Sequence, residues 1–329
     1  MAKVKTEAPV LTRVPPLQKN QLVHIPGLKW LLLIIPLCYV IFLLYFSIFS
    51  VLKLSVVNDA GMFTMEYVKQ IFMSPLYMKV LWITLKIAGL VTLFALLIGY
   101  PIAYLTCIIE SKFWKQIILG TVLVTLWISL LARTFSWQVI LQEYGVLNKL
   151  LIGIGIIDEP LQLLYNTPGV VVGMTHILLP YMVLSLYSVM ESIDYRLMQA
   201  AQGLGARPWK SFVQVFLPLS LPGVMSGSLI VFVLGLGYFI TPAILGGQTN
   251  MVIAKLIQEN IQMSLNWHMA SALSLLLLVT TLLLLGLAYW ASKLSPLGKG
   301  REINVAPHYG WHYFSAVDSA DFNYYTAFI

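Results

Sequence analysis

The chain has 329 residues, of which 59% are hydrophobic and only 10% charged, and its mean hydropathy is +0.84. A soluble core of this size could not hide so much apolar surface, so the composition predicts an integral membrane protein. The 20 Lys and Arg residues exceed the 13 Asp and Glu residues, an excess that in a membrane protein reports orientation, not nucleic-acid binding. Both cysteines, Cys38 and Cys107, lie in apolar stretches, which indicates neither a disulfide framework nor a zinc site.

The N-terminal part of the chain predicts a tail followed by a first span. Residues 1–29 are polar and proline-containing, and they predict a cytoplasmic tail. The apolar run over residues 30–52 is long enough to cross a bilayer and lacks a small-residue cleavage site, so it predicts a transmembrane helix and not a cleaved signal peptide. Residues 53–79 predict an external loop, with a turn at Asp59-Ala60-Gly61 and a short helix from Met65 to Phe72.

Two further spans follow, over residues 81–107 and 117–141. Pro101 lies in the first of them and should kink it, because proline removes a backbone donor. The second contains Arg133, and a guanidinium inside a bilayer costs a few kcal/mol, so it is normally paired or exposed to water. Three interpretations stay open: Arg133 snorkels to the outer headgroups, pairs with a carbonyl or with Glu143, or serves the cargo path.

The fourth span is predicted over Pro168 to Met190, after an external loop at residues 142–167, and Pro180 should break it. His176 lies inside this span. A lone histidine in an apolar helix is more often satisfied by a neighbouring backbone or hydroxyl group than used as a ligand, and no residue nearby completes a metal site.

The last two spans are predicted over residues 223–245 and 269–292. Glycines combine with Pro242 in residues 237–247, so the fifth helix should break there. An external segment at residues 248–267 separates the two spans. The remaining residues, 295–329, predict a cytoplasmic tail that is rich in aromatic residues and shows no helical or strand period.

A polar stretch, QAAQGLGARPWKSFVQVFLP, separates the fourth and fifth spans and runs from Gln199 to Pro218. Its alanines and glycines put almost no side chain on one short helical segment, so the surface of a partner could approach the backbone closely. Gly205 is placed to end this segment as a C-terminal cap, and Pro208 is placed to begin the next helix. The stretch therefore predicts a helix-turn-helix elbow that serves docking, not catalysis.

The spacing of residues in this elbow resembles the cytoplasmic EAA loop of ABC importer permeases. That frame has an acid, two alanines, a glycine four positions on, and then, after nine free positions, an aliphatic residue, a free position, Leu and Pro. The chain departs from the frame at Gln199, where the family has the acid, which puts in doubt a salt bridge from this residue to the ATPase. The resemblance implies that an ATPase couples to seven positions: Gln199, Ala200, Ala201, Gly205, Val215, Leu217 and Pro218.

The distribution of basic residues predicts the orientation. Thirteen lie at inner segments and six at outer ones, so the positive-inside rule places both termini and the elbow in the cytoplasm. The inner residues are Lys3, Lys5, Arg13, Lys19, Lys29, Lys112, Lys115, Arg196, Arg207, Lys210, Lys293, Lys299 and Arg301, and the outer ones are Lys53, Lys69, Lys79, Lys86, Lys149 and Lys255.

Six further runs narrow the resemblance: GYPIAYL (99–105), RTFSW (133–137), LLPYMVLSLY (178–187), FLPLSLPGVMSG (216–227), GYFITPAILGG (237–247) and NWHMASALSLLLL (266–278). They are similar to the spermidine/putrescine permeases, and the chain resembles the first of the two permease chains of that group. The resemblance implies a second, related permease chain, two ATPase subunits that use ATP and Mg, and an external binding protein that delivers cargo. The chain has no GxxxxGK[ST] phosphate loop, so we expect it to bind no cofactor itself.

The sequence thus predicts an all-α polytopic inner-membrane protein with about six spans: a cytoplasmic tail (1–29), a permease domain (30–294) and a second cytoplasmic tail (295–329). Resemblance favours a polyamine cargo, but an anionic solute such as an opine, phosphonate or carboxylate compound stays open because of Arg133. A more distant alternative is an ion-coupled secondary transporter, and no catalytic or metal-binding residue is predicted. Candidates for the translocation path are Tyr100, Tyr104, Arg133, Trp137, Tyr181 and Tyr238.

Overall fold

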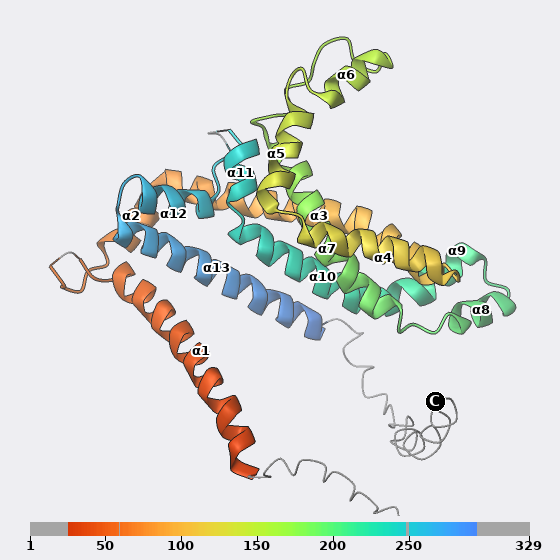
Figure 1. The fold of residues 1–329 in the computed structure, drawn as a ribbon, viewed down its shortest axis with the longest axis horizontal. Coiled ribbons are helices and arrows are strands. Elements are labelled where there is room, and N and C mark those ends of the chain that lie inside the picture. The colour runs from red at the N-terminus through yellow and green to blue at the C-terminus, as the bar shows by residue number, and fades with distance from the viewer. Residues whose placement is uncertain (1–25, 59, 248–249, 295–329) are drawn as a thin grey trace, which may run out of the picture. The chain divides into compact units, whose positions relative to one another are not determined.

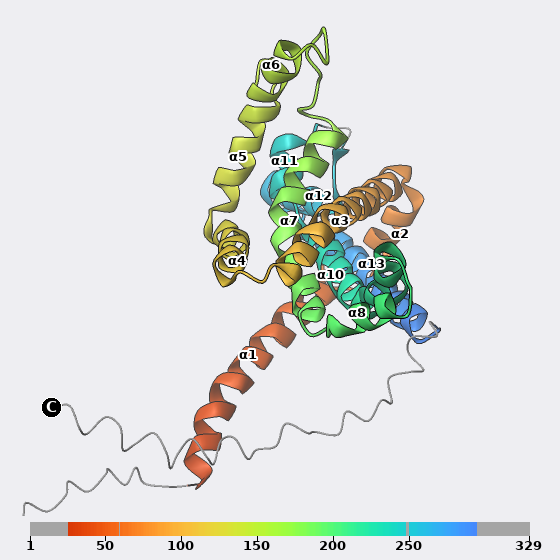
Figure 2. The same ribbon diagram turned by 90° about the vertical axis from the view of Figure 1, so that its right-hand side faces the viewer.

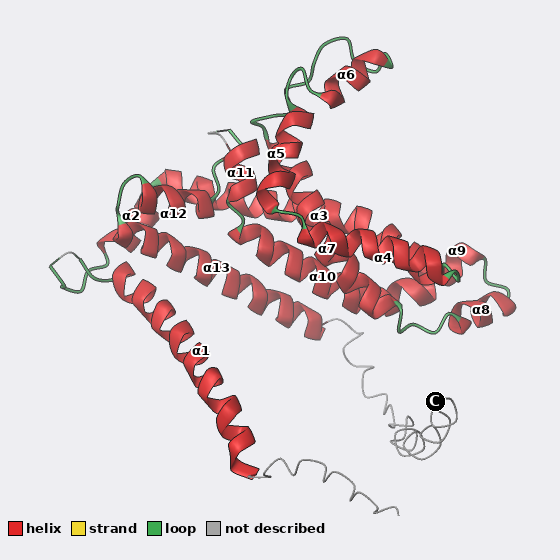
Figure 3. Ribbon diagram, viewed as in Figure 1, coloured by secondary structure: helices red, strands yellow, loops and turns green. Residues whose placement is uncertain are grey.

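The computed structural model describes residues 26–58, 60–247 and 250–294, and within these ranges the chain forms helices and no strand (Figure 3). Five of these helices are long and apolar enough to cross a membrane, and a sixth span results if one bent pair is counted. The predicted all-α polytopic fold is confirmed. Most of the two predicted tails, and part of the predicted turn at Asp59, lie outside the described residues.

The first helix, α1 (Pro26–Ser55), belongs mostly to a unit of its own that ends at Lys53. Residues 34–55 have a mean hydropathy of 2.4, which suits a membrane-spanning helix. The helix continues through Pro36.

Three helices of the second unit form its core: α3 (Pro75–Ile108), α7 (Thr167–Met190) and α10 (Leu217–Gly237) pack along one another (Figure 1). Glycines at their contacts explain the close packing. A Cβ added to Gly99 would lie 3.0 Å from Met182 Cγ, and one added to Gly227 would lie 2.8 Å from Met182 Sδ. Small residues allow such approach in a bilayer, where lipid tails provide no hydrophobic driving force between helices.

The predicted third span is not one continuous helix. It consists of α4 (Lys112–Trp127) and α5 (Leu130–Leu141), and the helices on the two sides of the break are bent by 100°. Ile128, between the two helices, has an extended backbone, and α5 then packs against other parts of the chain, with Thr134 Oγ1 3.3 Å from Thr241 Oγ1. The sequence predicted a span here but not the break within it, because a run of apolar residues indicates a length and does not reveal a bend that contacts with distant residues hold.

Two other boundaries also differ from the prediction. α7 continues through Pro180, because this buried proline lies in a helix that its neighbours enclose and hold. The fifth span begins earlier than predicted, as one helical run from Pro208, and it ends at Gly237. Tyr238 is extended before the short helix α11 (Ile240–Leu245), which confirms the predicted break.

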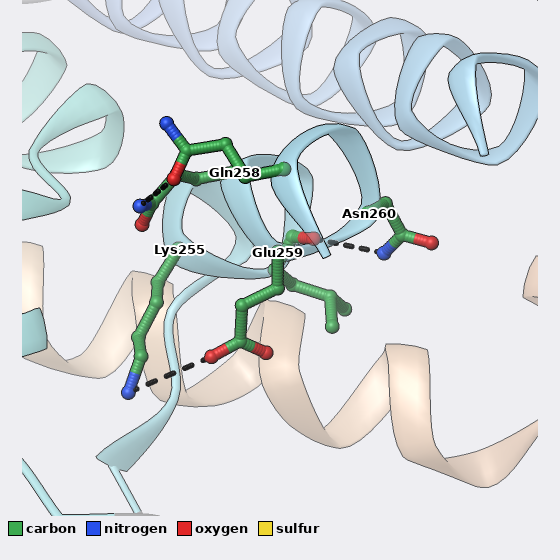
Figure 4. A network of polar contacts seen from close by, with 6 residues as sticks. Lys255, Gln258, Glu259 and Asn260 are labelled. Carbon is green, nitrogen blue, oxygen red and sulfur yellow. Dashed lines mark hydrogen bonds and ion pairs between the residues drawn. The ribbon is translucent and has the colours of Figure 1, made fainter. Parts of the chain in front are cut away.

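Short helices occupy the predicted external segments. Of these, α2 (Glu66–Met73) was predicted, whereas α6 (Val146–Gly153) and α12 (Ile253–Gln262) were not. The apolar side of α12 packs with α13 (Trp267–Leu294), which forms the sixth span. On the polar side of α12, Lys255 Nζ lies 3.8 Å from Glu259 Oε1, and the Gln258 side chain donates a 2.7 Å hydrogen bond to Gln262 (Figure 4).

Candidate functional site

The elbow begins with α8 (Arg196–Gly203), whose first backbone N–H donates to Asp194 Oδ1 at 2.9 Å. The helix ends in two hydrogen bonds across the turn, from the Gly205 N–H to the Gln202 carbonyl at 2.9 Å and from the Ala206 N–H to the Ala201 carbonyl at 3.1 Å. This pair of bonds needs a left-handed residue at the position of Gly205, whose φ is +92°. The predicted roles of Gly205 as a C-terminal cap and of Pro208 as the start of the next helix are confirmed.

The inner side of the elbow is anchored to the long helix that follows it. Met198 is buried, and its carbonyl accepts a 2.9 Å hydrogen bond from the fully buried Ser211 Oγ. Ser211 ends α9 (Pro208–Ser211), and Phe216, one turn further on, is also buried. Because these contacts connect α8 to the start of the fifth span, a displacement of α8 would also displace the helix over Pro208–Gly237.

The outer side of the elbow is open. Gln199, Ala200 and Gly203 are exposed, and a Cβ added to Gly203 or Gly205 would meet nothing within 4 Å. Between the two glycines Leu204 is 91% exposed. Sequence reasoning missed this residue, although a leucine in an otherwise polar turn was a readable signal.

Charge and aromatic surface surround Leu204. Arg196, Arg207 and Lys210 are exposed, and Trp209 is 72% exposed. An exposed apolar tip with a basic surround is typical of a surface that docks a partner. Figure 1 shows α8 and α9 at one end of the core helices, and Figure 2 shows α8 away from α5 and α6.

A π-helical turn, η1 (Phe212–Phe216), joins α9 to α10. The Leu217 N–H donates to the carbonyl of Phe212, five residues back, and Pro218 follows directly. A proline ring clashes with the carbonyl four residues before it, and a widened turn moves that carbonyl away. Val215, Leu217 and Pro218, which the sequence placed in the coupling loop, are partly buried here and do not lie on the open surface.

Aromatic rings from α3 hold this π-helical turn. The ring of Tyr104 lies edge-on to Phe212 and Phe216, at centroid distances of 5.0 and 4.9 Å. Tyr100 Oη is 2.8 Å from Ser220 Oγ on α10. Two of the four tyrosines predicted to line the path, Tyr100 and Tyr104, therefore pack against α10 and η1.

An ion pair lies at this end of the molecule, between the first turn of α4 and the residue that follows α7. Lys115 Nζ lies 2.7 Å from Glu191 Oε1 and 5.2 Å from the centroid of the Tyr187 ring. The hydrogen bond from Lys115, with a smaller contribution from Tyr187, lowers the pKa of Glu191. The pair ties the start of α4 to the end of α7, directly before the elbow.

The other predicted path residues come from different elements: Arg133 and Trp137 lie on α5, Tyr181 lies on α7, and Tyr238 directly follows α10. Trp137 Nε1 donates to His176 Nδ1 at 3.1 Å, so the histidine is satisfied by an indole and not by the backbone or hydroxyl group that was expected. Both rings line a cavity of about 520 Å³ between α3 and α7. Arg133 and Tyr181 interact electrostatically with Tyr238. The six predicted path residues thus form two separate groups.

Together these features define a class: a helical membrane protein whose described spans are joined by an exposed, internally anchored elbow. Residues 95–294 match the family described as "Binding-protein-dependent transport system inner membrane component", and the chain belongs to that family. It is therefore a multi-pass inner-membrane transport subunit and not an enzyme. In the described residues no group of three or more His, Cys, Asp or Glu side chains is placed to hold a metal ion.

Named relatives and a solved structure agree with this assignment. The chain is 37% identical over 231 residues to the spermidine/putrescine transport system permease protein PotB of Haemophilus influenzae, covering 70% of this chain and 80% of that protein. It is 33% identical over 238 residues to PotB of Escherichia coli, covering 70% and 86%. A bacterial ABC transporter involved in the import of the acidic polysaccharide alginate shares the fold, with a TM-score of 0.64, 20% identity, and coverage of 81% of this chain and 96% of that one.

Proposed function

We propose that this chain is a permease subunit of an ATP-driven importer of polyamines such as spermidine and putrescine. The observation that carries the proposal is its 37% identity to a protein named for spermidine and putrescine transport, over 80% of that protein's length. A second, related permease chain completes the pathway, an external binding protein delivers cargo, and separate ATPase subunits use ATP and Mg. The permease domain covers residues 30–294, between two tails.

The elbow is the docking site for the ATPase in this proposal. Its exposed Gln199, Ala200, Gly203 and Leu204 form the contact surface, and the buried Ser211 to Met198 hydrogen bond transmits movement to the long helix. Closure of the ATPase dimer on ATP then moves the elbow as a lever and switches the pathway between its two openings. Gln199 contributes a neutral hydrogen-bonding side chain where the related loops have an acid.

The elbow and both termini face the cytoplasm in this proposal, because an ATPase can reach them only there. Single cysteines introduced near Arg207 and Asp158 test the arrangement. A membrane-impermeant maleimide added to intact cells should label the site near Asp158 and leave the one near Arg207 unlabelled until the cells are opened. Labelling near Arg207 from outside would contradict the orientation.

Uptake of labelled putrescine and spermidine by cells that express the complete transporter tests the cargo. We expect uptake of at least one, dependent on the binding protein and abolished when the ATPase cannot hydrolyse ATP. The control is the same strain with this chain omitted. If neither polyamine enters while the ATPase and binding protein function, the cargo is another small polar organic solute.

One observation favours an anionic solute as that second candidate. Nε and Nη1 of Arg133 are buried and have no hydrogen-bond partner within the described residues, so the guanidinium has donors to offer a carboxylate. The same uptake assay with labelled anionic compounds separates the two candidates.

A further inference from the structure

The inference concerns the charge of the elbow, which carries three basic side chains. Arg196 lies at the start of α8, Arg207 and Lys210 come after the turn, and all three are exposed. By sequence, no Asp or Glu lies in residues 195–218. Among the described residues none of the three basic groups forms an ion pair, because the two ion pairs found there involve other lysines. Their charges are therefore available to a partner.

The nearest acids before the elbow are already engaged. Glu191 Oε1 lies 2.7 Å from Lys115 Nζ, so its charge is paired. Asp194 Oδ1 accepts a 2.9 Å hydrogen bond from the Arg196 N–H, where a carboxylate also suits the positive end of the α8 dipole. The turn at the other end of α8 has no acidic neighbour along the chain, so its positive charge is not balanced locally.

The basic groups lie on both sides of one exposed apolar tip. Leu204 is 91% exposed, and it precedes Arg207 by three residues and Lys210 by six. Arg196 lies eight residues before Leu204, or about 12 Å along a helix. A Cβ added to either glycine beside the leucine would meet nothing within 4 Å, so a partner can reach the tip and its backbone. An apolar centre with a polar rim is typical of protein interfaces, and complementary rim charges speed association.

We propose that the ATPase receives Leu204 in an apolar pocket whose rim carries Asp or Glu side chains, and that these acids pair with Arg196, Arg207 and Lys210. The inference rests on the proposed function, in which an ATPase docks on the elbow. Charge complementarity selects the acidic rim, because a basic rim would repel the three exposed charges as the surfaces approach and a neutral rim would leave them unpaired.

Anionic lipid headgroups would attract the same charges, but they do not suit the apolar tip. α7 alone has 24 residues, or about 36 Å of helix, which exceeds the hydrocarbon core of about 30 Å. The elbow follows the inner end of α7 and so lies beyond the hydrocarbon core, where Leu204 would meet no lipid tails. A protein pocket satisfies both the leucine and the basic groups.

Carbodiimide coupling in the complete transporter tests the acidic rim on the unchanged protein. A water-soluble carbodiimide activates a carboxylate, and a nearby lysine amine then forms an amide while the carboxylate oxygen leaves in the urea. We expect mass spectrometry to find an amide between Lys210 and an Asp or Glu of the ATPase. Lys210→Arg keeps the charge but cannot form the amide, so it is the matched control. Arg207→Lys should add a second amide to the ATPase, at position 207.

Charge reversal measures the contribution of the rim to binding. Arg207→Glu combined with Lys210→Glu should weaken binding of the purified ATPase to the permease pair in phosphatidylcholine nanodiscs by about tenfold or more at low salt. The loss should shrink at about 1 M salt, where the Debye length is about 3 Å. Lys112→Glu is the matched control and should leave binding unchanged, because Lys112 is an exposed residue at the start of α4 that forms no ion pair among the described residues.

Three results would overturn the proposal. They are amides from position 210 to the permease chains alone, equal losses of binding in the double variant and in Lys112→Glu, or a loss that appears only when phosphatidylglycerol is added to the nanodiscs. The last result would assign the charges to lipid headgroups. If no amide forms, the charge reversal decides: a salt-dependent loss in phosphatidylcholine supports the acidic rim, and no loss overturns it. If the unchanged protein does not bind the ATPase, the docking role itself fails, and this is seen before any charge is altered.

Discussion

The elbow and the bent third span are built in opposite ways. The elbow closes on itself through short-range bonds, such as Gly205 to Gln202, and exposes Leu204 on a surface that needs no partner to form. The bend depends on distant contacts, such as Thr134 with Thr241, and leaves two nitrogens of Arg133 without partners in the described chain. The elbow is therefore held by bonds between residues a few positions apart, whereas the bend needs elements that are far apart in the sequence.

The largest effect is expected when the exposed side chain of Leu204 is removed, which tests whether the elbow contacts the ATPase. Leu204→Ser should leave folding intact, because the side chain is 91% exposed, but should weaken ATPase binding. A central apolar contact is worth about 2 kcal/mol, or roughly 30-fold in affinity. The amount of ATPase that co-purifies and the rate of cargo uptake are the measurements. Each should fall by about tenfold or more.

Met263→Ser is the matched control for this change. Met263 is 80% exposed and lies at the end of α12, on the side of the molecule that the proposed orientation places outside the cell. We expect this variant to bind the ATPase and transport cargo as the unchanged protein does. Equal losses in both variants would mean that exposed apolar residues matter for insertion, and the docking role of Leu204 would be lost.

Gly205→Asp alters both the surface and the backbone of the elbow. Gly205 has a φ of +92°, so a side chain there is strained by about 1–2 kcal/mol, and the new carboxylate lies on the proposed contact surface. Transport should fail while the chain still inserts. Survival of both transport and ATPase association would end the assignment of residues 199–207 as a docking helix.

Two controls divide the effect of Gly205→Asp into its parts. Gly203→Asp places the same charge at a helical position with open space around it, so it tests the surface without the backbone strain. Gly205→Asn keeps a residue type that tolerates a left-handed backbone and adds no charge. We expect uptake to fall in Gly203→Asp and to be partly retained in Gly205→Asn.

The same contrast explains what could be predicted from the sequence. The cap at Gly205 and the helix start at Pro208 depend on residues a few positions apart, and the sequence located both. The break before Arg133 could not be predicted, because the contact beside it joins Thr134 to Thr241, which are 107 residues apart, and the run is apolar on both sides. Tyr100 and Tyr104 were predicted to line a path because their residue type suits one, but only packing shows that they hold Phe212 and Ser220.

The hydrogen bond between the hydroxyl groups of Tyr100 and Ser220 joins α3 to α10. We expect its removal to have a smaller effect than the changes in the elbow. Tyr100→Phe and Ser220→Ala each remove the 2.8 Å contact beyond the π-helical turn. Such bonds between membrane helices contribute about 0.6 kcal/mol on average, so the double variant should lose little more than either single one. Thermal unfolding in detergent measures the interaction energy between Tyr100 and Ser220. Cargo-stimulated ATP hydrolysis measures whether movement still passes between the permease and the ATPase.

Ser185→Ala with Ser226→Ala is the matched pair for this cycle. Their hydroxyl oxygens are 3.0 Å apart and join α7 to α10, and both residues lie outside the elbow stretch of residues 199–218. Both cycles should lower stability alike, and only the Tyr100 cycle should reduce cargo-stimulated hydrolysis. Identical effects on hydrolysis would show that the contact holds the bundle together and has no special part in coupling.

The smallest expected effect belongs to the ion pair that closes the base of the elbow. Glu191 has a pKa below its ordinary value because Lys115 donates a hydrogen bond to it, so its carboxylate form stabilises the folded chain. That contribution is present above the ordinary value near 4.5 and is lost as the pH falls through the lowered pKa of the folded state. Half of the Glu191 side chain is exposed, so solvent screening limits the contribution to under about 1 kcal/mol. Glu191→Gln should therefore lower the melting temperature slightly at pH 7, and the difference from the unchanged protein should shrink as the pH falls below 4.5.

Glu110→Gln removes an exposed carboxylate for which the described residues show no ion pair, and it should leave the melting temperature at pH 7 unchanged. A difference for Glu191→Gln that persists unchanged at low pH would mean that the residue acts through packing, and its charge would then play no part in holding the elbow.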